Sequence, residues 1–247
     1  MRIGSETGGM GRTPLVLDQP EGGYRYTLDP FLLASFVKLG RGERVIDLGS
    51  GVGVIGLVLA SIYPDVHITG IEIQGGLHEA SLKNIVGSGS IERVESRLGD
   101  FRSIGNYFRP SSFTAAVSNP PYYTANRCRI SRDRGVAVAK HGIKGGIGEV
   151  IDASSIVLIE GGSLSLIFPA EKFSGLEALL NDRGFSIKRA RFVKSKEHLK
   201  AKAVMLEAVL GTATQTEVAQ PLIVHDGEGG YTDEVSGIFE RIGARSF

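Results

Sequence analysis

The sequence predicts an α/β fold in which a mostly parallel β-sheet is covered by helices on both faces. Three observations predict it. Short apolar segments alternate with longer segments of helical periodicity along most of the chain. The first apolar segment, residues 44–49, runs through a glycine turn directly into an apolar helix, as a β-turn-α unit does. The chain has 247 residues, of which 42% are hydrophobic, which is enough for the core of one α/β domain.

The first unit joins the strand at residues 44–49 to a helix at residues 52–63, which Pro64 closes. The same alternation then repeats. We expect further strands at residues 66–73, 93–98, 113–118, 163–168, 185–193 and 201–210, and helices at residues 77–86, 101–108, 148–159 and 171–183. Right-handed crossovers make most of these strands parallel. The last two strands are expected to form an antiparallel hairpin at the edge of a seven-stranded sheet.

Both ends of the chain carry weaker signals. Residues 23–29 alternate like a strand, and residues 30–39 look helical with a proline in the first turn. Near the other end, residues 221–225 are strand-like and residues 233–242 predict a short helix.

The composition excludes several classes of protein. No run of about 18 apolar residues could span a bilayer, and residues 1–11 are glycine-rich rather than apolar, so we expect no membrane span, no signal peptide and a cytoplasmic location. Cys128 is the only cysteine, which excludes an internal disulfide and a multi-cysteine metal cage. The five histidines never fall at a short metal-ligand spacing, so we expect no metal site.

The net charge of +1 is unevenly distributed. Residues 127–144 carry a net charge of +5, residues 188–202 carry +6, and the rest of the chain sums to −10. A charge run alone is often only a solvated face. Two basic segments on an otherwise acidic chain favour a polyanion as partner, provided that the fold brings them together. The cations expected to contact a nucleic acid are Arg127, Arg129, Arg132, Arg134 and Lys140.

A glycine loop follows the first strand. Gly51-Val-Gly53-Val-Ile-Gly56 lies between a strand and a helix, and Glu72 follows about 20 residues later, which also satisfies the dinucleotide-binding fingerprint. This motif alone does not decide the cofactor. Asp47 discriminates, because a carboxylate at the end of the strand suits a cofactor with a cationic amino-acid end and would repel a pyrophosphate. S-adenosylmethionine is such a cofactor.

Three carboxylates follow three successive strands: Asp47, Glu72 and Asp100. Glu72 would accept hydrogen bonds from ribose hydroxyls, and Asp100 would accept one from an adenine amino group. A helix N-cap is the alternative role for each carboxylate singly. Their recurrence at one edge of the sheet favours a cofactor site.

The segment Asn119-Pro120-Pro121-Tyr122 follows the predicted fourth strand. Its two prolines fix φ and prevent both helix formation and ladder pairing, so the chain is rigid there. The Asn119 side-chain oxygen and the Pro120 carbonyl can each accept one N–H from a target amine and stabilise positive charge as it develops. Tyr122 would stack on a flat base. An ordinary turn is the alternative. However, the segment is expected at the same edge of the sheet as the glycine loop, beyond the carboxyl ends of the strands, and this position favours methyl transfer to an exocyclic amino nitrogen.

These motifs resemble the class I S-adenosylmethionine-dependent amino-methyltransferases, and more narrowly the tRNA1(Val) (adenine(37)-N6)-methyltransferase family. The resemblance covers most of the chain and is carried by residues 23–29, 45–55, 70–74, 118–123 and 191–193. It implies a Rossmann-like fold, S-adenosylmethionine as cofactor, and N6-methylation of an adenine in a tRNA anticodon loop. The residues expected to bind the cofactor are Asp47, Gly49, Gly51, Glu72, Ile73, Asp100, Phe101 and Asn119, and those expected to hold the target base are Asn119, Pro120 and Tyr122.

The chain is expected to divide into a cap of the cofactor site (residues 1–43), a methyltransferase domain (residues 44–210) and an extension packed on that domain (residues 211–247). The oligomeric state, monomer or homodimer, is left open.

Other functions share the Asn-Pro-Pro-Tyr motif. Enzymes that methylate a glutamine amide in release factors carry it, as do enzymes that act on guanine N2 in ribosomal RNA. The protein-methylating enzymes have a helical substrate domain before the glycine loop, whereas about forty residues precede Arg44 here. A NAD-dependent dehydrogenase would leave Asp47 and Asn119 unexplained. The possibility that the chain is a module that binds the cofactor without catalysing a reaction stays open.

Overall fold

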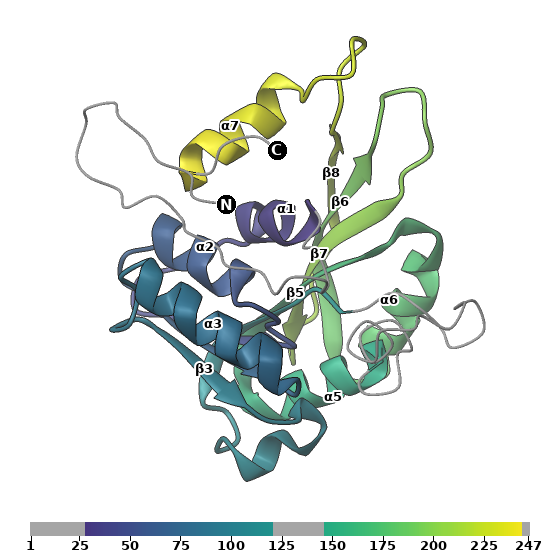
Figure 1. Ribbon diagram of the computed structural model, residues 1–247. Helices are drawn as coiled ribbons and strands as arrows, with labels where there is room; N and C mark the ends of the chain where they lie inside the picture. Colours follow the sequence, from purple (N-terminus) through teal and green to yellow (C-terminus); the bar gives the residue numbers. More distant parts are fainter. Residues whose placement is uncertain (1–27, 121–145, 244–247) are drawn as a thin grey trace, which may run out of the picture.

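The computed structural model describes residues 28–120 and 146–243 (Figure 1). Its strands form one sheet in the order β3-β2-β1-β4-β5-β7-β6-β8. The strands are β1 (Arg44–Leu48), β2 (His67–Glu72), β3 (Val94–Leu98), β4 (Phe113–Ser118), β5 (Leu158–Pro169), β6 (Phe185–Lys194), β7 (Ala203–Leu210) and β8 (Glu217–Ile223). Among these described strands only β7 runs antiparallel to its neighbours. The predicted mostly parallel sheet with a β6–β7 hairpin is confirmed.

The expected strand count was wrong, because the sheet has eight strands rather than seven. β8 pairs in parallel with β6, so the hairpin lies one strand inside the edge. Of β8, only Leu222 is buried, and the first residues of the strand are exposed. Backbone pairing rather than an apolar pattern therefore defines β8. The pairing register with β6 shifts beside Pro221, which has no N–H to donate.

The helices are α1 (Asp29–Phe36), α2 (Val54–Ile62), α3 (Gly75–Gly87), α5 (Ile147–Val157), α6 (Phe173–Asn181) and α7 (Asp233–Ile242), with 3-10 helices η1 (Phe101–Asn106) and η3 (Ala170–Lys172). The segment expected as a helix at residues 101–108 is thus a 3-10 helix, kinked at Ser103. None of the helices in the described ranges is long and apolar enough to cross a membrane.

The core has two layers, one on each face of the sheet. Figure 1 shows α1, α2, α3 and α7 on one face and α5 and α6 on the other. Along β1, Val45 packs into the first layer, whereas Ile46 and Leu48 pack into the second. Because side chains alternate along a strand, Asp47 lies on the face of Val45, beneath α1 and α2.

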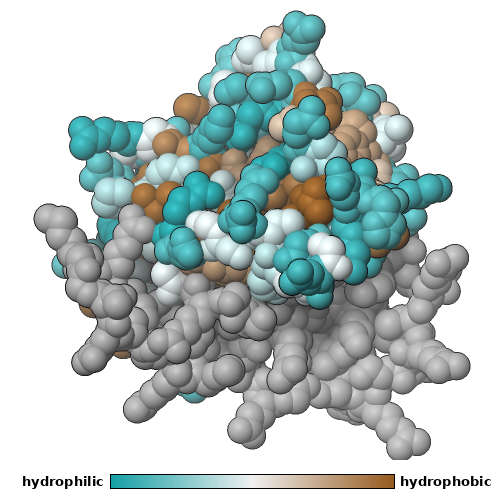
Figure 2. Space-filling model, turned by 90° about the horizontal axis from the view of Figure 1, so that it is seen from above, coloured by the Kyte–Doolittle hydropathy of each residue, from teal (hydrophilic) through white to brown (hydrophobic). Residues whose placement is uncertain are grey.

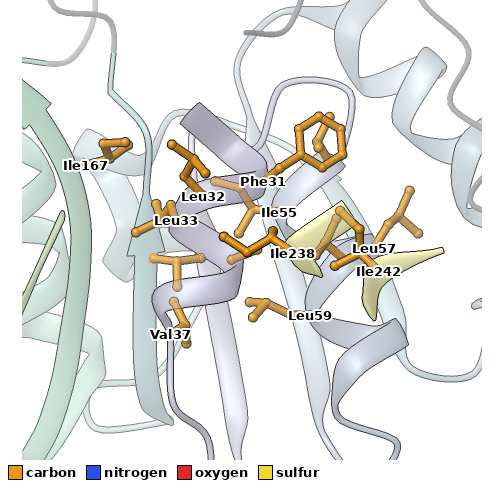
Figure 3. Close-up of a cluster of buried hydrophobic side chains, with 14 of the residues drawn as sticks. Phe31, Leu32, Leu33, Val37, Ile55, Leu57, Leu59, Ile167, Ile238 and Ile242 are labelled. Carbon is orange, nitrogen blue, oxygen red and sulfur yellow. The ribbon is translucent and has the colours of Figure 1, made fainter. Parts of the chain in front are cut away.

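The helix α7 belongs to the first core layer. Its buried residues Val235, Ile238, Phe239 and Ile242 recur at helical spacing and pack with α1 and α2. Figure 3 shows Ile238 and Ile242 beside Phe31 of α1 and Leu57 of α2. Thr232 caps the helix, since its side chain accepts a hydrogen bond from the Val235 N–H.

Candidate cofactor and catalytic site

The candidate site lies where the order of the strands reverses. β1 pairs with β2 on one side and with β4 on the other, so that Asp47 is flanked by Gly70 and Val117. Glu72 is the last residue of β2, and Asn119 follows β4 directly. Ligands of open α/β sheets bind at this point, beyond the carboxyl ends of the strands.

The glycine loop depends on conformations that favour glycine. Gly49, Gly51 and Gly53 have φ values of 77°, 58° and 85°. The N–H groups of Gly49 and Ser50 both donate to the Ile71 carbonyl, at 2.9 and 3.2 Å, which folds the loop back over β2.

Two neighbouring residues determine where this loop lies, one by leaving room for it and one by a hydrogen bond to it. At Gly70 of β2, a Cβ atom would lie 2.7 Å from Ser50 Oγ, so only glycine leaves room for the loop. On the other side, the buried Asn84 of α3 donates from Nδ2 to the Val52 carbonyl at 2.9 Å. The loop is thereby fixed against both a strand and a helix.

Asp47 is a buried carboxylate without a hydrogen bond in the described part of the chain. It is 1% exposed, and neither carboxylate oxygen has a partner there; the same holds for Ser50 Oγ. Burial, and next the negative charge of Glu72, raise the pKa of Asp47 to about 8. The Gly56 N–H opposes this shift only in part, because it does not reach hydrogen-bond geometry. Such a group awaits a cationic partner.

Glu72 is buried, but its oxygens are engaged. Oε2 accepts the Gly51 N–H and Oε1 accepts the Gln74 N–H, both at 2.9 Å. The carboxylate therefore links the end of β2 to the glycine loop and to the start of α3. Each oxygen retains a lone pair that a hydroxyl group could use.

Asp100 has the capping role that was the alternative prediction. It is the N-cap of η1, where its Oδ1 accepts the Arg102 N–H at 3.0 Å, and it forms an ion pair with the Arg102 guanidinium. This pairing raises the pKa of Arg102. The next residue, Phe101, is half-buried, and its ring lies 3.8 Å from the position of a Cβ at Gly49. The half-buried Ile73 follows β2.

A buried hydrogen bond joins the two halves of the site. Ser118 is fully buried, and its Oγ donates to the Leu48 carbonyl at 2.7 Å. This bond ties the residue before Asn119 to the residue before Gly49. Asn119 is half-buried and Pro120 is buried at the same rim. The structure therefore brings together the glycine loop and the first half of the Asn-Pro-Pro-Tyr segment.

Several predicted residues lie outside the described ranges. These are Tyr122, Arg127, Arg129, Arg132, Arg134 and Lys140. Within residues 28–120 and 146–243, no group of three histidine, cysteine, aspartate or glutamate side chains could hold a metal ion.

Sequence reasoning missed Ser50, Asn84 and Ser118. Asn84 carried a usable signal, since it is a polar residue on the buried face of a predicted helix. Ser50 and Ser118 carried none, because serine is common in loops and at strand ends. Their roles follow only from the packing of β1 against β2 and β4.

Comparison with known proteins assigns the family. Residues 29–200 match the methyltransferase small domain. The chain belongs to the methyltransferase small domain family. A tRNA1(Val) (adenine(37)-N6)-methyltransferase of Shewanella sp. (strain MR-4) is 27% identical over 222 residues, which cover 89% of this chain and 92% of that protein. A protein of the same name from Porphyromonas gingivalis is 26% identical over 209 residues, covering 83% and 81%.

The solved structures agree with the family in fold. A crystal structure described as a predicted O-methyltransferase from Agrobacterium tumefaciens has a TM-score of 0.69 at 22% identity and covers 89% of this chain and 99% of that one. The fold of the chain is that of class I methyltransferases. As a member of the methyltransferase small domain family, the protein is a methyltransferase. The candidate site lies beyond the carboxyl ends of the strands, which is where open α/β sheets bind ligands.

Proposed function

We propose that the protein is an S-adenosylmethionine-dependent methyltransferase that methylates N6 of an adenine in tRNA, an anticodon-loop adenosine. The observation that carries this proposal is the Ser118–Leu48 hydrogen bond, at 2.7 Å, which sets Asn119 and Pro120 beside the glycine loop. A methyl donor held by the loop and an amine held by Asn119 would then lie on one rim.

The donor groups at the loop fit S-adenosylmethionine. Asp47, buried and without a hydrogen bond among the described residues, would pair with the ammonium of the amino-acid end. Glu72 would accept the ribose hydroxyls with its remaining lone pairs. Asp100 would accept a hydrogen bond from the adenine amino group, with Ile73 and Phe101 as apolar neighbours. Gly49 and Gly51 let the backbone approach the cofactor closely. When bound, the cofactor supplies an electrophilic methyl group on a sulfonium.

The target amine needs orientation more than a base. The Asn119 side-chain oxygen and the Pro120 carbonyl would each accept one N–H of the amine and so direct its lone pair toward the methyl group. Both acceptors also stabilise the positive charge that develops on the nitrogen. Tyr122 would stack on the base.

The substrate class is supported by the relatives. Those named tRNA1(Val) (adenine(37)-N6)-methyltransferase match this chain over most of their length. We propose that Arg127, Arg129, Arg132, Arg134 and Lys140 contact the RNA and that the activity is cytoplasmic, where tRNA is modified. We also propose that residues 1–43 cap the cofactor site and that residues 211–247 pack on the catalytic domain. The packing of α1 and α7 on α2, which begins beside Gly53, supports both.

The test is a methylation assay. Purified protein is incubated with unmodified tRNA and S-adenosylmethionine, and nucleosides are analysed by mass spectrometry. N6-methyladenosine is expected. Asn119→Ala should lower the rate about 100-fold or more, since such polar groups contribute that much at charged transition states, while cofactor affinity stays within a few fold. The exposed Asn181, replaced by Ala, is the matched control. Methylation of guanine or of a protein glutamine instead would refute the proposal.

A further inference from the structure

The basic segment at residues 188–202 divides into two parts in the structure. The first part is paired. Arg189 Nε donates to the buried Glu207 Oε2 at 2.6 Å, and Lys188 Nζ lies 3.3 Å from Glu207 Oε1. Arg191 binds the Glu234 carboxylate with two nitrogens, at 2.7 and 2.9 Å. These three cations stabilise the sheet and the attachment of α7, and each is paired with one of two carboxylates, Glu207 and Glu234, which leaves one net positive charge.

The second part is the turn between β6 and β7, which we name the hairpin tip, Lys194–Lys202. It carries four lysines and one glutamate, a net charge of +3. These lysines are Lys194, Lys196, Lys200 and Lys202. None has a carboxylate within ion-pair distance in the described ranges. Lys194 Nζ donates only to the Glu197 backbone carbonyl, at 3.1 Å.

The hairpin tip lies at the carboxyl edge of the sheet, as the candidate site does, because β6 is parallel to β1 through β5. In Figure 1 it projects beyond the strands as a green loop. Figure 2 views the molecule from that side and shows a mostly hydrophilic surface outside the grey atoms. The tip is therefore on the rim from which a substrate would approach.

The pairing register gives the distance from the tip to the candidate site. Across the sheet, Ser118 is level with Leu166, Leu206 and Ala190. Three strand spacings place β6 about 14 Å from β4, and four further residues carry Lys194 about 13 Å beyond that level, so the tip begins about 20 Å from Ser118. A stacked nucleic-acid strand advances roughly 3.4 Å per nucleotide, so about six nucleotides span this distance.

An acidic loop borders the tip on the side away from the candidate site. The His225 N–H donates to the Ser195 carbonyl at 2.9 Å, and Asp226 and Glu228 follow in that loop. The phosphates of a nucleic-acid strand would be repelled there, so the strand would lie over β7, β5 and β4 instead. Lysine side chains are flexible point charges, which suit contacts with phosphate groups rather than with base edges.

We propose that the hairpin tip is an RNA-backbone contact, which binds phosphates of the substrate several nucleotides away from the methylated base. This inference rests on the proposed function. The tip would position the RNA and would not touch the reacting atoms. An acidic protein segment is the other polyanion that such a surface could bind, and the experiment separates the two.

The experiment compares two double variants of equal charge change. In the test variant Lys196→Gln and Lys200→Gln are combined. In the control variant Lys38→Gln and Lys83→Gln are combined, two exposed lysines elsewhere in the fold. The tRNA dissociation constant is measured from 0.05 to 0.3 M salt. Loss of two phosphate contacts should make the negative slope of log affinity against log salt shallower by about 1.4–1.8. It should also weaken tRNA binding at 0.1 M salt roughly tenfold or more. The control variant should stay within twofold.

Further measurements separate the possible failures. S-adenosylmethionine affinity and the unfolding temperature should match the wild type in both variants. A five-nucleotide RNA around the target adenine should bind both variants equally, because it cannot reach the tip. If the test variant binds full-length tRNA as the control does, the inference is wrong while the proposed function stands. If the wild type neither binds nor methylates tRNA, or binds only an acidic peptide, both are overturned.

Discussion

Lowering the pH from 8 to 6 is expected to weaken S-adenosylmethionine binding about 20-fold. Only ionised Asp47 can pair with the ammonium of the cofactor, and burial beside Glu72 raises the Asp47 pKa to about 8. About half of the protein then carries the carboxylate at pH 8 and about 1% at pH 6. The apparent dissociation constant rises in inverse proportion to that fraction, about 50-fold between pH 8 and 6. Roughly half or more of the cofactor's own ammonium is deprotonated at pH 8, which reduces the net change to about 20-fold.

The same pKa makes cofactor binding release a proton. Calorimetric titrations at pH 5.5–7.5, in two buffers of different ionisation enthalpy, should report close to one proton released per cofactor bound. Below about pH 6.7 the ammonium is almost fully protonated, because an α-amino group titrates at about 7.7–8.0, so the release should be closest to one proton in the lower part of this range. 5′-Methylthioadenosine, which lacks the amino-acid end, should bind without this release.

The variant Asp47→Asn separates this explanation from a general effect of pH. It should bind S-adenosylmethionine weakly at every pH and without proton release. An affinity of the wild type that is constant between pH 5.5 and 7.5 would refute the assignment of Asp47 to the ammonium.

The protonation of Asp47 also links the stability of the cofactor-free protein to pH. The folded-state pKa of about 8 lies above the ordinary 3.8, so this group's contribution to stability is complete below about pH 4 and is lost as the pH rises through 8. The loss is at most about 6 kcal/mol, at 1.36 kcal/mol per pKa unit. Urea unfolding of Asp47→Asn should therefore lack most of the decline that the wild type shows between pH 5 and 8.

Three other substitutions test the architecture of the rim. Ser118→Ala should cost about 1–3 kcal/mol of unfolding free energy, because a buried carbonyl loses its donor, and it should lower kcat more than cofactor affinity; unchanged kcat would contradict its positioning role. Gly70→Ala should weaken cofactor binding, since its Cβ would lie 2.7 Å from Ser50 Oγ and 2.8 Å from Ser50 Cβ, and calorimetry should find rescue by Ser50→Gly. Arg102→Ala should tighten cofactor binding by about two- to fivefold, because it frees Asp100 from an exposed ion pair; weaker binding would exclude Asp100 as the adenine acceptor.

The fold could be predicted because local patterns and topology agree. The buried strands and amphipathic helices were visible as apolar periodicity, and their alternation implies parallel strands. The edge strand β8 was largely invisible, because Leu222 is its one buried residue and backbone pairing alone carries no residue pattern. The helix expected at residues 101–108 is a 3-10 helix at Phe101–Asn106, with Asp100 as its N-cap and a backbone kink at Ser103.

The candidate site was predictable in its components and not in its connections. Asp47, Glu72 and Asn119 follow from their positions at strand ends. That the Gly51 N–H bonds to Glu72, and that Ser118 bonds to the Leu48 carbonyl, depends on neighbouring strands 21 and 70 residues apart in sequence. Such bonds leave no local pattern. Asp100 shows that position at a strand end does not by itself define a role, because this carboxylate is the N-cap of η1. Its role toward the adenine stays a prediction.

The charge that a basic segment can offer to a ligand depends on its ion-pair partners, which the sequence does not reveal. The segment at residues 188–202 is strongly basic in sequence. In the structure, however, Glu207 and Glu234 pair with its first three cations, across 18 and 43 residues of sequence for Arg189 and Arg191. Arg189 and Glu207 face each other across β6 and β7, and both are largely buried, so removal of either would leave a buried charge at a cost of roughly 3–5 kcal/mol. No such constraint acts on the lysines of the hairpin tip, which are exposed or half-exposed. Substitution there should therefore leave the fold intact and change only what the surface binds, which is why the tip rather than the whole segment can test for RNA.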